Sequence, residues 1–200
     1  DALALTDAPF VVFSNVDVIP SPDCLVTAVS ALQADPHRGT VAVKLLRTVQ
    51  EDGADVIDST GHVLTTARLI QNRGAGQEDV GQWEVAGPVF GASGALSVHR
   101  REMLDDVAWQ PGEVLSEDLF AYFEDVELDW RARLLGWDAW YEPRAVARHQ
   151  RGGIGPRRTV AVDALNWANR LLLIATCDDP RSLRRHAVSV AATTLLKSVE

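Results

Sequence analysis

The chain has 200 residues, of which 46% are hydrophobic and 24% are charged. This length and balance predict one folded domain with a real core and exclude an intrinsically disordered chain. The net charge of −9 argues against nucleic acid as a general partner, because nucleic-acid-binding surfaces are basic. Cys24 and Cys177 are too few for a disulfide framework, so a reducing cytoplasm is the simplest expected compartment.

A short apolar run, FVVF at residues 10–13, is the first predicted element. Its β-branched and aromatic residues predict a buried strand of a parallel sheet. Asn15 and Asp17 follow at the carboxyl end of this strand, which is the edge where α/β folds bind ligands. Asp17 could give an oxygen ligand to a metal ion. On spacing alone, a polar turn whose side chains bond their own backbone is the simpler interpretation.

The sequence S-P-D at residues 21–23 predicts the start of a helix that runs to about residue 34. A second strand is predicted at residues 40–46. The order strand, helix, strand favours a layered α/β fold. Residues 47–81 look like loops with short strands, and His62 is expected to be a surface or hairpin residue rather than a ligand.

Very small side chains alternate with apolar ones in the segment WEVAGPVFGASGALSV, residues 83–98. Its centre is Ala92, Ser93 and Gly94. Such a segment lets a ligand or another backbone approach closely. Close packing of a strand on a helix explains it equally well, and the sequence leaves both readings open.

The pattern of residues 125–135 predicts an amphipathic helix that is closed by Gly136. Asp125 falls at or near the N-cap and directly follows Glu124. A capping aspartate would contribute about 1 kcal/mol and no chemistry. Capping and catalysis are nevertheless compatible, because a helix N-terminus holds a carboxylate ionised, which is the state that a general base needs.

Residues 137–141 alternate as a strand that is expected to stop at the Glu-Pro pair that follows. His149 lies beyond it, and alone it is typical of a packed or surface histidine. The next stretch, residues 150–158, is rich in glycine and arginine. Arg157 and Arg158 within it could close over a phosphate, since arginine binds phosphate bidentately.

Two helices are predicted at the end of the chain, over residues 160–176 and 181–199. Arginines flank their apolar faces, so peripheral contact with a membrane surface is open beside plain core packing.

Four segments in order resemble the inverting family 2 glycosyltransferases of the GT-A fold, especially bacterial rhamnosyltransferase-like members. They are FSNVDVIPSPDCL, VFGASGALSVHRREML, LFAYFEDVELDWRARLLGWDAWYEPRAVARH and NWANRLLLI. The resemblance implies an α/β, Rossmann-like mixed sheet with flanking helices. It implies that residues 1–158 are a GT-A catalytic segment that lacks the family's first, nucleotide-binding strands. Residues 159–200 are then a C-terminal helical extension.

The same resemblance implies a metal site for a divalent cation, Mn²⁺ or Mg²⁺. Asp17 matches the last acidic residue of the family's metal-binding DxD-like motif, and His149 matches a histidine that completes this site in some members. Asn15 stands where many members have aspartate. This departure leaves one carboxylate fewer at the expected metal site.

The resemblance also implies the groups that act on the substrates. Asp125 matches the catalytic base and Glu124 its companion near the acceptor. The segment of Ala92, Ser93 and Gly94 matches the one that passes close to the donor sugar and the acceptor.

The implied activity is transfer of a hexosyl group, with rhamnose as the guess, from a nucleotide-diphosphate sugar to an acceptor with inversion. The expected acceptor is a lipid-linked or cell-envelope polysaccharide at the cytoplasmic face of the plasma membrane. An alternative is a non-catalytic glycan- or nucleotide-sugar-binding remnant of such an enzyme, which Asn15 and the missing first strands favour. A nucleotidyltransferase is a third hypothesis, and it leaves the Glu-Asp pair unexplained.

Overall fold

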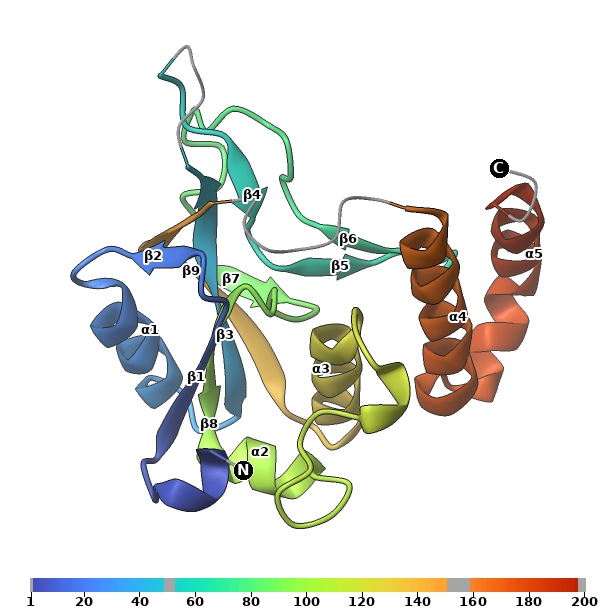
Figure 1. Ribbon diagram of the computed structural model, residues 1–200, viewed down its shortest axis with the longest axis horizontal. Helices are drawn as coiled ribbons and strands as arrows, with labels where there is room; N and C mark the ends of the chain where they lie inside the picture. The colour runs from blue at the N-terminus through green and yellow to red at the C-terminus, as the bar shows by residue number, and fades with distance from the viewer. Residues whose placement is uncertain (1, 49–52, 151–158, 198–200) are drawn as a thin grey trace.

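The computed structural model describes residues 2–48, 53–150 and 159–197 (Figure 1). These ranges form a seven-stranded mixed sheet, a two-stranded hairpin and five α-helices. The strands are β1 (Phe10–Ser14), β2 (Val18–Pro20), β3 (Arg38–Arg47), β4 (Ile57–Ser59), β5 (His62–Leu64), β6 (Ile70–Asn72), β7 (Gly87–Val89), β8 (Leu96–Arg100) and β9 (Asp138–His149). The α-helices are α1 (Cys24–Gln33), α2 (Arg101–Val107), α3 (Glu124–Leu134), α4 (Val160–Cys177) and α5 (Pro180–Lys197), and short 3-10 turns lie at Ala2–Leu5 and Glu117–Leu119.

The main sheet has the strand order β1-β8-β3-β9-β2, with β4 paired to β3 and β7 paired to β9. The central strands β3 and β9 run parallel, while the other pairs in this sheet are antiparallel. The predicted mixed α/β sheet is therefore confirmed. The prediction that residues 10–13 form a buried strand of a parallel sheet is wrong, because β1 pairs antiparallel with β8 and Val12 is 39% exposed.

The strand predicted to stop at Glu142 continues to His149 as β9. The register with β3 shifts here, so that Val43 lies opposite Glu142 and Lys44 lies opposite Val146. Pro143 falls inside this irregularity, where the strand pairing is interrupted, so the missing N–H of proline costs no hydrogen bond. The long strand carries His149 to the same edge of the sheet as the end of β3.

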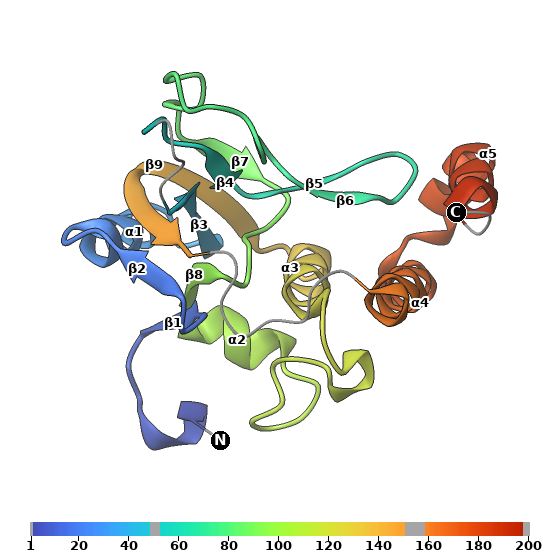
Figure 2. The same cartoon turned by 45° about the horizontal axis from the view of Figure 1, so that its top comes forward.

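Helices cover both faces of the sheet (Figures 1 and 2). Helix α1 lies on one face, where Leu32 packs with Val41 and Val98 in the main core cluster. Helices α2 and α3 lie on the other face, and Met103 and Leu128 belong to a second cluster there. The start of α3 lies against the segment before β8, where Asp125 accepts a hydrogen bond from the Gly94 N–H, and this contact places the candidate site.

The predicted C-terminal helices are confirmed as α4 and α5, and α4 packs on α3. Leu173 of α4 shares a buried cluster with Val126 and Trp130 of α3. The β5–β6 hairpin reaches across to α4 (Figure 1), where Arg170 donates to the carbonyl of Arg68 at 2.9 Å. In the ranges that the structure describes, no helix is both long enough and apolar enough to cross a bilayer.

Candidate active site

A strained turn leads into helix α3. Phe120, Tyr122 and Phe123 have φ angles of 58°, 67° and 70°, in the left-handed region that is uncommon for residues other than glycine. Asn169 of α4 holds this turn, because its buried side-chain amide lies 3.0, 2.9 and 2.9 Å from the carbonyl oxygens of residues 119, 121 and 122. Such strain persists where surrounding contacts fix it, and it clusters at functional sites.

Asp125 is the second residue of α3, because the helix has Phe123 as its N-cap. Its Oδ2 accepts a hydrogen bond from the Gly94 N–H at 2.7 Å, and its Oδ1 accepts one from the Val126 N–H at 2.8 Å. The carboxylate thus binds an N–H of the first turn of α3 and also holds the segment of residues 92–94 against the helix. Its side chain is still 24% exposed, so a substrate can reach it.

A cavity of about 370 Å³ opens at Asp125. Its lining includes Glu124, Ala92, Gly94 and Asn15. The structure therefore brings together the predicted base, its companion, part of the predicted substrate segment and one residue of the predicted metal motif. The volume is in the range of small-molecule binding sites.

The small-residue segment lies directly against α3. Asp129 of α3 accepts the Ala92 N–H at 2.7 Å, one helical turn after Asp125 accepts that of Gly94. A Cβ built on Gly91 would lie 2.0 Å from Asp129 Oδ2, and one on Gly94 would lie 3.2 Å from Asp125 Oδ2. The small residues thus admit two helix carboxylates to the backbone, and two of them also line the cavity. The two readings of this segment are compatible.

The carboxyl group of Glu124 belongs to a residue that lines the cavity. Burial, and to a smaller extent the neighbouring charge of Asp125, raise its pKa above the ordinary value. Its Oε2 atom is buried and makes no hydrogen bond within the described residues. A carboxyl oxygen in this state is suited to accept a hydrogen bond from a sugar hydroxyl.

His99 closes the floor of the cavity as a neutral group. Its ring nitrogens lie 3.1 Å from Thr40 Oγ1 and 2.7 Å from Ser97 Oγ, and its ring packs on Phe13 at a centroid distance of 4.7 Å. Complete burial lowers the pKa of His99 to about 3. It therefore supplies fixed dipoles at neutral pH and no charge.

His62 is a site residue that the sequence reasoning missed. The expectation of a hairpin position is confirmed, since His62 begins β5, but the expected surface position is wrong because the residue is 3% exposed. Its Nε2 lies 3.7 Å from Asp125 Oδ2 and its Nδ1 lies 3.7 Å from Asp129 Oδ2. The one available signal was that Asp125 and Asp129 are four residues apart, and so share a helix face.

The predicted metal residues Asp17 and His149 lie together. Pairing of β2 with β9 sets Val18 opposite His149, and His149 Nε2 is 3.4 Å from Asp17 Oδ1. The other ring nitrogen, Nδ1, lies 2.8 Å from Oδ2 of Asp58 in β4. Histidine ligands are commonly fixed in this way, by a carboxylate on the nitrogen that faces away from the metal. No local sequence pattern marked Asp58 for this role.

The donor set fits a divalent cation only in part. Within the described ranges, no group of three or more His, Cys, Asp or Glu side chains is arranged to hold a metal ion. Asp17 and His149 could supply two ligands, and the phosphates of a donor would have to supply others. Asn15 lines the cavity at Asp125. Arg157 and Arg158, the predicted phosphate-binding arginines, lie outside the described residues.

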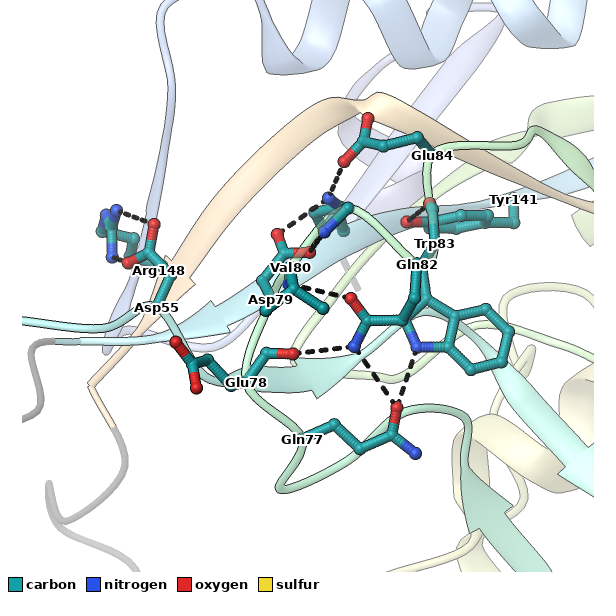
Figure 3. Close-up of polar contacts among 12 residues, drawn as sticks. Asp55, Gln77, Glu78, Asp79, Val80, Gln82, Trp83, Glu84, Tyr141 and Arg148 are labelled. Atoms are coloured by element: carbon teal, nitrogen blue, oxygen red, sulfur yellow. Dashed lines mark hydrogen bonds and ion pairs between the residues drawn. The ribbon is translucent and has the colours of Figure 1, made fainter.

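A second polar cluster fixes the loop of residues 77–84 on the central strand β3 (Figure 3). Buried Lys44 binds Asp79 at 2.8 Å and also binds Glu84. On the neighbouring strand β9, the hydroxyl of Tyr141 donates to the carbonyl of Trp83 at 3.0 Å. Lys44 lies three residues before Arg47, the β3 residue opposite His149, so this cluster stiffens the sheet edge that carries the metal pair.

The comparison with solved structures finds glycosyltransferases. Two of them are a crystal structure of GalNAc-T7 with UDP, GalNAc and Mn²⁺, and the mannosyltransferase PcManGT from Pyrobaculum calidifontis in complex with GDP-Man and Mn²⁺. The first has a TM-score of 0.56 at 11% identity and covers 84% of this chain and 31% of that one. The second has a TM-score of 0.50 at 18% identity and covers 99% of this chain and 52% of that one.

At these identities the likeness shows the fold, which is GT-A-like, as the resemblance implied. The chain spans about a third and about half of the length of the two structures. No curated protein sequence matches the chain. The family model described as glycosyltransferase-like family 2 matches residues 2–165, which is most of the chain. The protein therefore belongs to glycosyltransferase-like family 2.

Proposed function

We propose that this family 2 glycosyltransferase moves a sugar from a nucleotide-diphosphate donor to an acceptor hydroxyl with inversion, and that Asp125 is the base. The observation that carries the proposal is the placement of Asp125. Its carboxylate is held by the Gly94 N–H at 2.7 Å, remains 24% exposed, and borders a cavity of about 370 Å³.

In the proposed reaction, the acceptor oxygen forms a bond to the anomeric carbon while the bond from that carbon to the diphosphate oxygen breaks. Asp125 takes the proton of the acceptor hydroxyl, and the diphosphate leaves with the bonding electrons. Glu124, whose pKa is raised chiefly by burial, orients the acceptor through its unpaired Oε2. A positioned base of this kind contributes about 10²–10⁴-fold to the rate.

The metal assignment is part of the proposal. Asp17 and His149 would hold a divalent cation, Mn²⁺ or Mg²⁺, which would supply positive charge to the leaving diphosphate. The support is the 3.4 Å approach of these side chains and the contact of His149 with Asp58. Of the two similar structures, one contains UDP, GalNAc and Mn²⁺ and the other GDP-Man and Mn²⁺. Arg157 and Arg158 are proposed to contact the same phosphates.

The finer identity of the substrates is proposed from the resemblance of the sequence segments. The donor sugar is rhamnose, and the acceptor is a lipid-linked or cell-envelope glycan of a bacterium. The enzyme then works at the cytoplasmic face of the plasma membrane. Exposed Arg181, Arg184 and Arg185 on α5, with exposed Leu195 and Leu196 on the same helix, support peripheral contact with an anionic surface.

The proposal is tested with Asp125→Asn in the purified enzyme, assayed for sugar transfer from a panel of nucleotide sugars. We expect transfer to fall by at least about 10²-fold while donor affinity stays within a few-fold. Asp23→Asn is the matched control, because Asp23 is exposed and its side chain makes no cap hydrogen bond on α1. Turnover by Asp125→Asn close to that of the control would refute the base assignment.

A non-catalytic binding remnant is the second candidate, and the presence of Asn15 in place of an acidic residue favours it. Calorimetry with donor and Mn²⁺ separates the two. Donor binding without transfer or donor hydrolysis in the wild-type protein would support the remnant. Measurable transfer that is lost in Asp125→Asn would exclude it.

A further inference from the structure

Three ionisable side chains from two distant segments lie in a row that begins at Asp125, which lines the cavity. His62 of β5 lies between Asp125 and Asp129, which follow one another on one face of α3. Both separations are 3.7 Å, which is the range of an ion pair rather than of a hydrogen bond. The side chain of His62 is 4% exposed and that of Asp129 is 2% exposed, so water screens this row poorly.

The backbone fixes His62 in this place independently of its side chain. Its N–H donates to the carbonyl of Gly91 at 2.8 Å, and its carbonyl accepts from the N–H of Phe90 at 3.1 Å. The same loop then passes under α3, where Asp129 and Asp125 hold Ala92 and Gly94. One short stretch of backbone therefore sets the imidazole and both carboxylates relative to each other.

Other charged groups also lie near His62. Arg73 after β6, Arg133 of α3 and Asp138 of β9 line a cavity of about 350 Å³ together with His62. Arg133 stacks over the ring of Phe90 and Arg73 stacks over Trp83 and Tyr141, so both guanidinium groups have their own contacts. The described ion pairs of the imidazole are those with Asp125 and Asp129.

We propose that His62 is a positioning residue for the transfer reaction, and that its imidazolium is a counter-ion that holds the Asp125 carboxylate in place and directs it at the acceptor. This inference rests on the proposed role of Asp125 as base. Asp129 is the partner that keeps His62 charged. Burial opposes this charge, but the two carboxylates outweigh it and raise the pKa of His62 above its ordinary value.

The electrostatic role has a signature that a merely structural role lacks. Without the imidazolium, Asp125 and Asp129 would face each other as two like charges one helical turn apart. The Asp125 carboxylate would then lose the charge that fixes its direction, and transfer would slow. The same loss should set in for the wild type as the pH rises and His62 gives up its proton.

The kinetic test compares His62→Gln with the wild type in pH profiles of kcat/KM for transfer. We expect His62→Gln to be slower than the wild type at neutral pH, by up to about 10²-fold, and its activity at high pH, where His62 of the wild type has lost its proton, to lie within a few-fold of wild type. His37→Gln is the control, because it makes the same change at an exposed histidine before β3. Superimposable profiles, or a loss that is uniform across pH, would overturn the proposal.

A second measurement does not depend on activity or on the folding of a His62 variant. The ring nitrogens of the 5 histidines are followed by NMR over a pH titration of the wild-type protein and of Asp129→Asn. We expect the His62 ring to remain an imidazolium at neutral pH in the wild type and to lose its proton at lower pH in Asp129→Asn. A His62 that is neutral throughout would overturn the proposal even if His62→Gln does not fold.

The Asp125→Asn assay separates this inference from the proposed function. If Asp125→Asn still transfers sugar, the base assignment and the positioning role both fail, whatever the state of His62. If Asp125→Asn is inactive and the His62→Gln profile is unchanged, only the positioning role fails.

Discussion

Substitution of Gly91 by alanine tests the packing of the small-residue segment on helix α3. The added Cβ would lie 2.0 Å from Oδ2, 2.4 Å from Cγ and 2.6 Å from Cβ of Asp129. Real Cβ atoms do not approach other atoms this closely, so the segment or the aspartate must move. Asp129 is 2% exposed and sits in the middle of α3, so its side chain has little room to turn away.

The cost has two parts. Loss of the hydrogen bond from the Ala92 N–H to the Asp129 carboxylate costs about 1.5–3 kcal/mol. Overpacking of the buried contact costs a further 1–3 kcal/mol, roughly. Alanine also restricts the unfolded chain more than glycine does, which offsets about 0.4–1 kcal/mol of this loss in the free energy of unfolding. We therefore expect Gly91→Ala to lower the free energy of unfolding by about 2–5 kcal/mol, a large share of the total of about 5–15 kcal/mol.

The assay is urea unfolding followed by circular dichroism, with Gly87→Ala as the matched control. A Cβ on Gly87 meets no atom within 4 Å, so that variant should be as stable as the wild type or slightly more stable. The double variant Gly91→Ala with Asp129→Ala should be less destabilised than the sum of the single changes, because the two closest contacts, with Oδ2 and Cγ of Asp129, are removed. A Gly91→Ala protein within about 0.5 kcal/mol of the control would refute this account of the segment.

Three further predictions concern groups around the site. Since burial lowers the pKa of His99 to about 3, the unfolded chain binds a proton below about pH 6.5 that the folded chain excludes, and stability falls as pH falls through this window. We expect a loss of about 2 kcal/mol between pH 7 and pH 5 in urea unfolding, and His99→Gln should remove this part of the slope. Lys44→Met should cost about 3 kcal/mol, because it leaves the half-buried Asp79 without its cation, and a smaller loss in a variant that also carries Asp79→Asn would confirm the cause. Asp58→Asn should weaken Mn²⁺ binding about 10–100-fold in calorimetry, because Asp58 orients His149, and unchanged affinity would exclude this orienting role.

The local sequence predicted those elements whose patterns are long. The helix of α3 with Gly136 after it is one case, since Gly136 has a φ of +93°. Its predicted amphipathic pattern is wrong, because Leu134 and Leu135 are exposed while Asp129 is buried. The end of β9 is the opposite case. A Glu-Pro pair normally interrupts a strand, and only the register shift against β3 allows β9 to continue to His149. The register is a property of two paired strands, so the sequence of one segment does not predict it.

The candidate site shows the same division. Asp17, Asp125 and His149 were predicted from the resemblance of their segments to the family, and the structure brings Asp17 to His149 and Asp125 to the cavity. His62 and Asp58 were not predicted as site residues, because they lie in a loop-like region with no periodic pattern. Their roles arise from contacts with residues more than sixty positions away along the chain, which are set by the tertiary fold.

The hydrogen bonds from Asn169 to the turn before α3 affect the order of folding during biosynthesis. N-terminal segments of a chain generally begin to fold while later ones are still being made. The sheet and the start of α3 can form early, but the carbonyls of Leu119 and Tyr122 gain their shared partner only when residue 169 has left the ribosome. The turn that presents Asp125 is therefore completed late, after the cavity walls on the sheet are in place. A nascent or C-terminally shortened chain would contain Asp125 without the contact that fixes its approach.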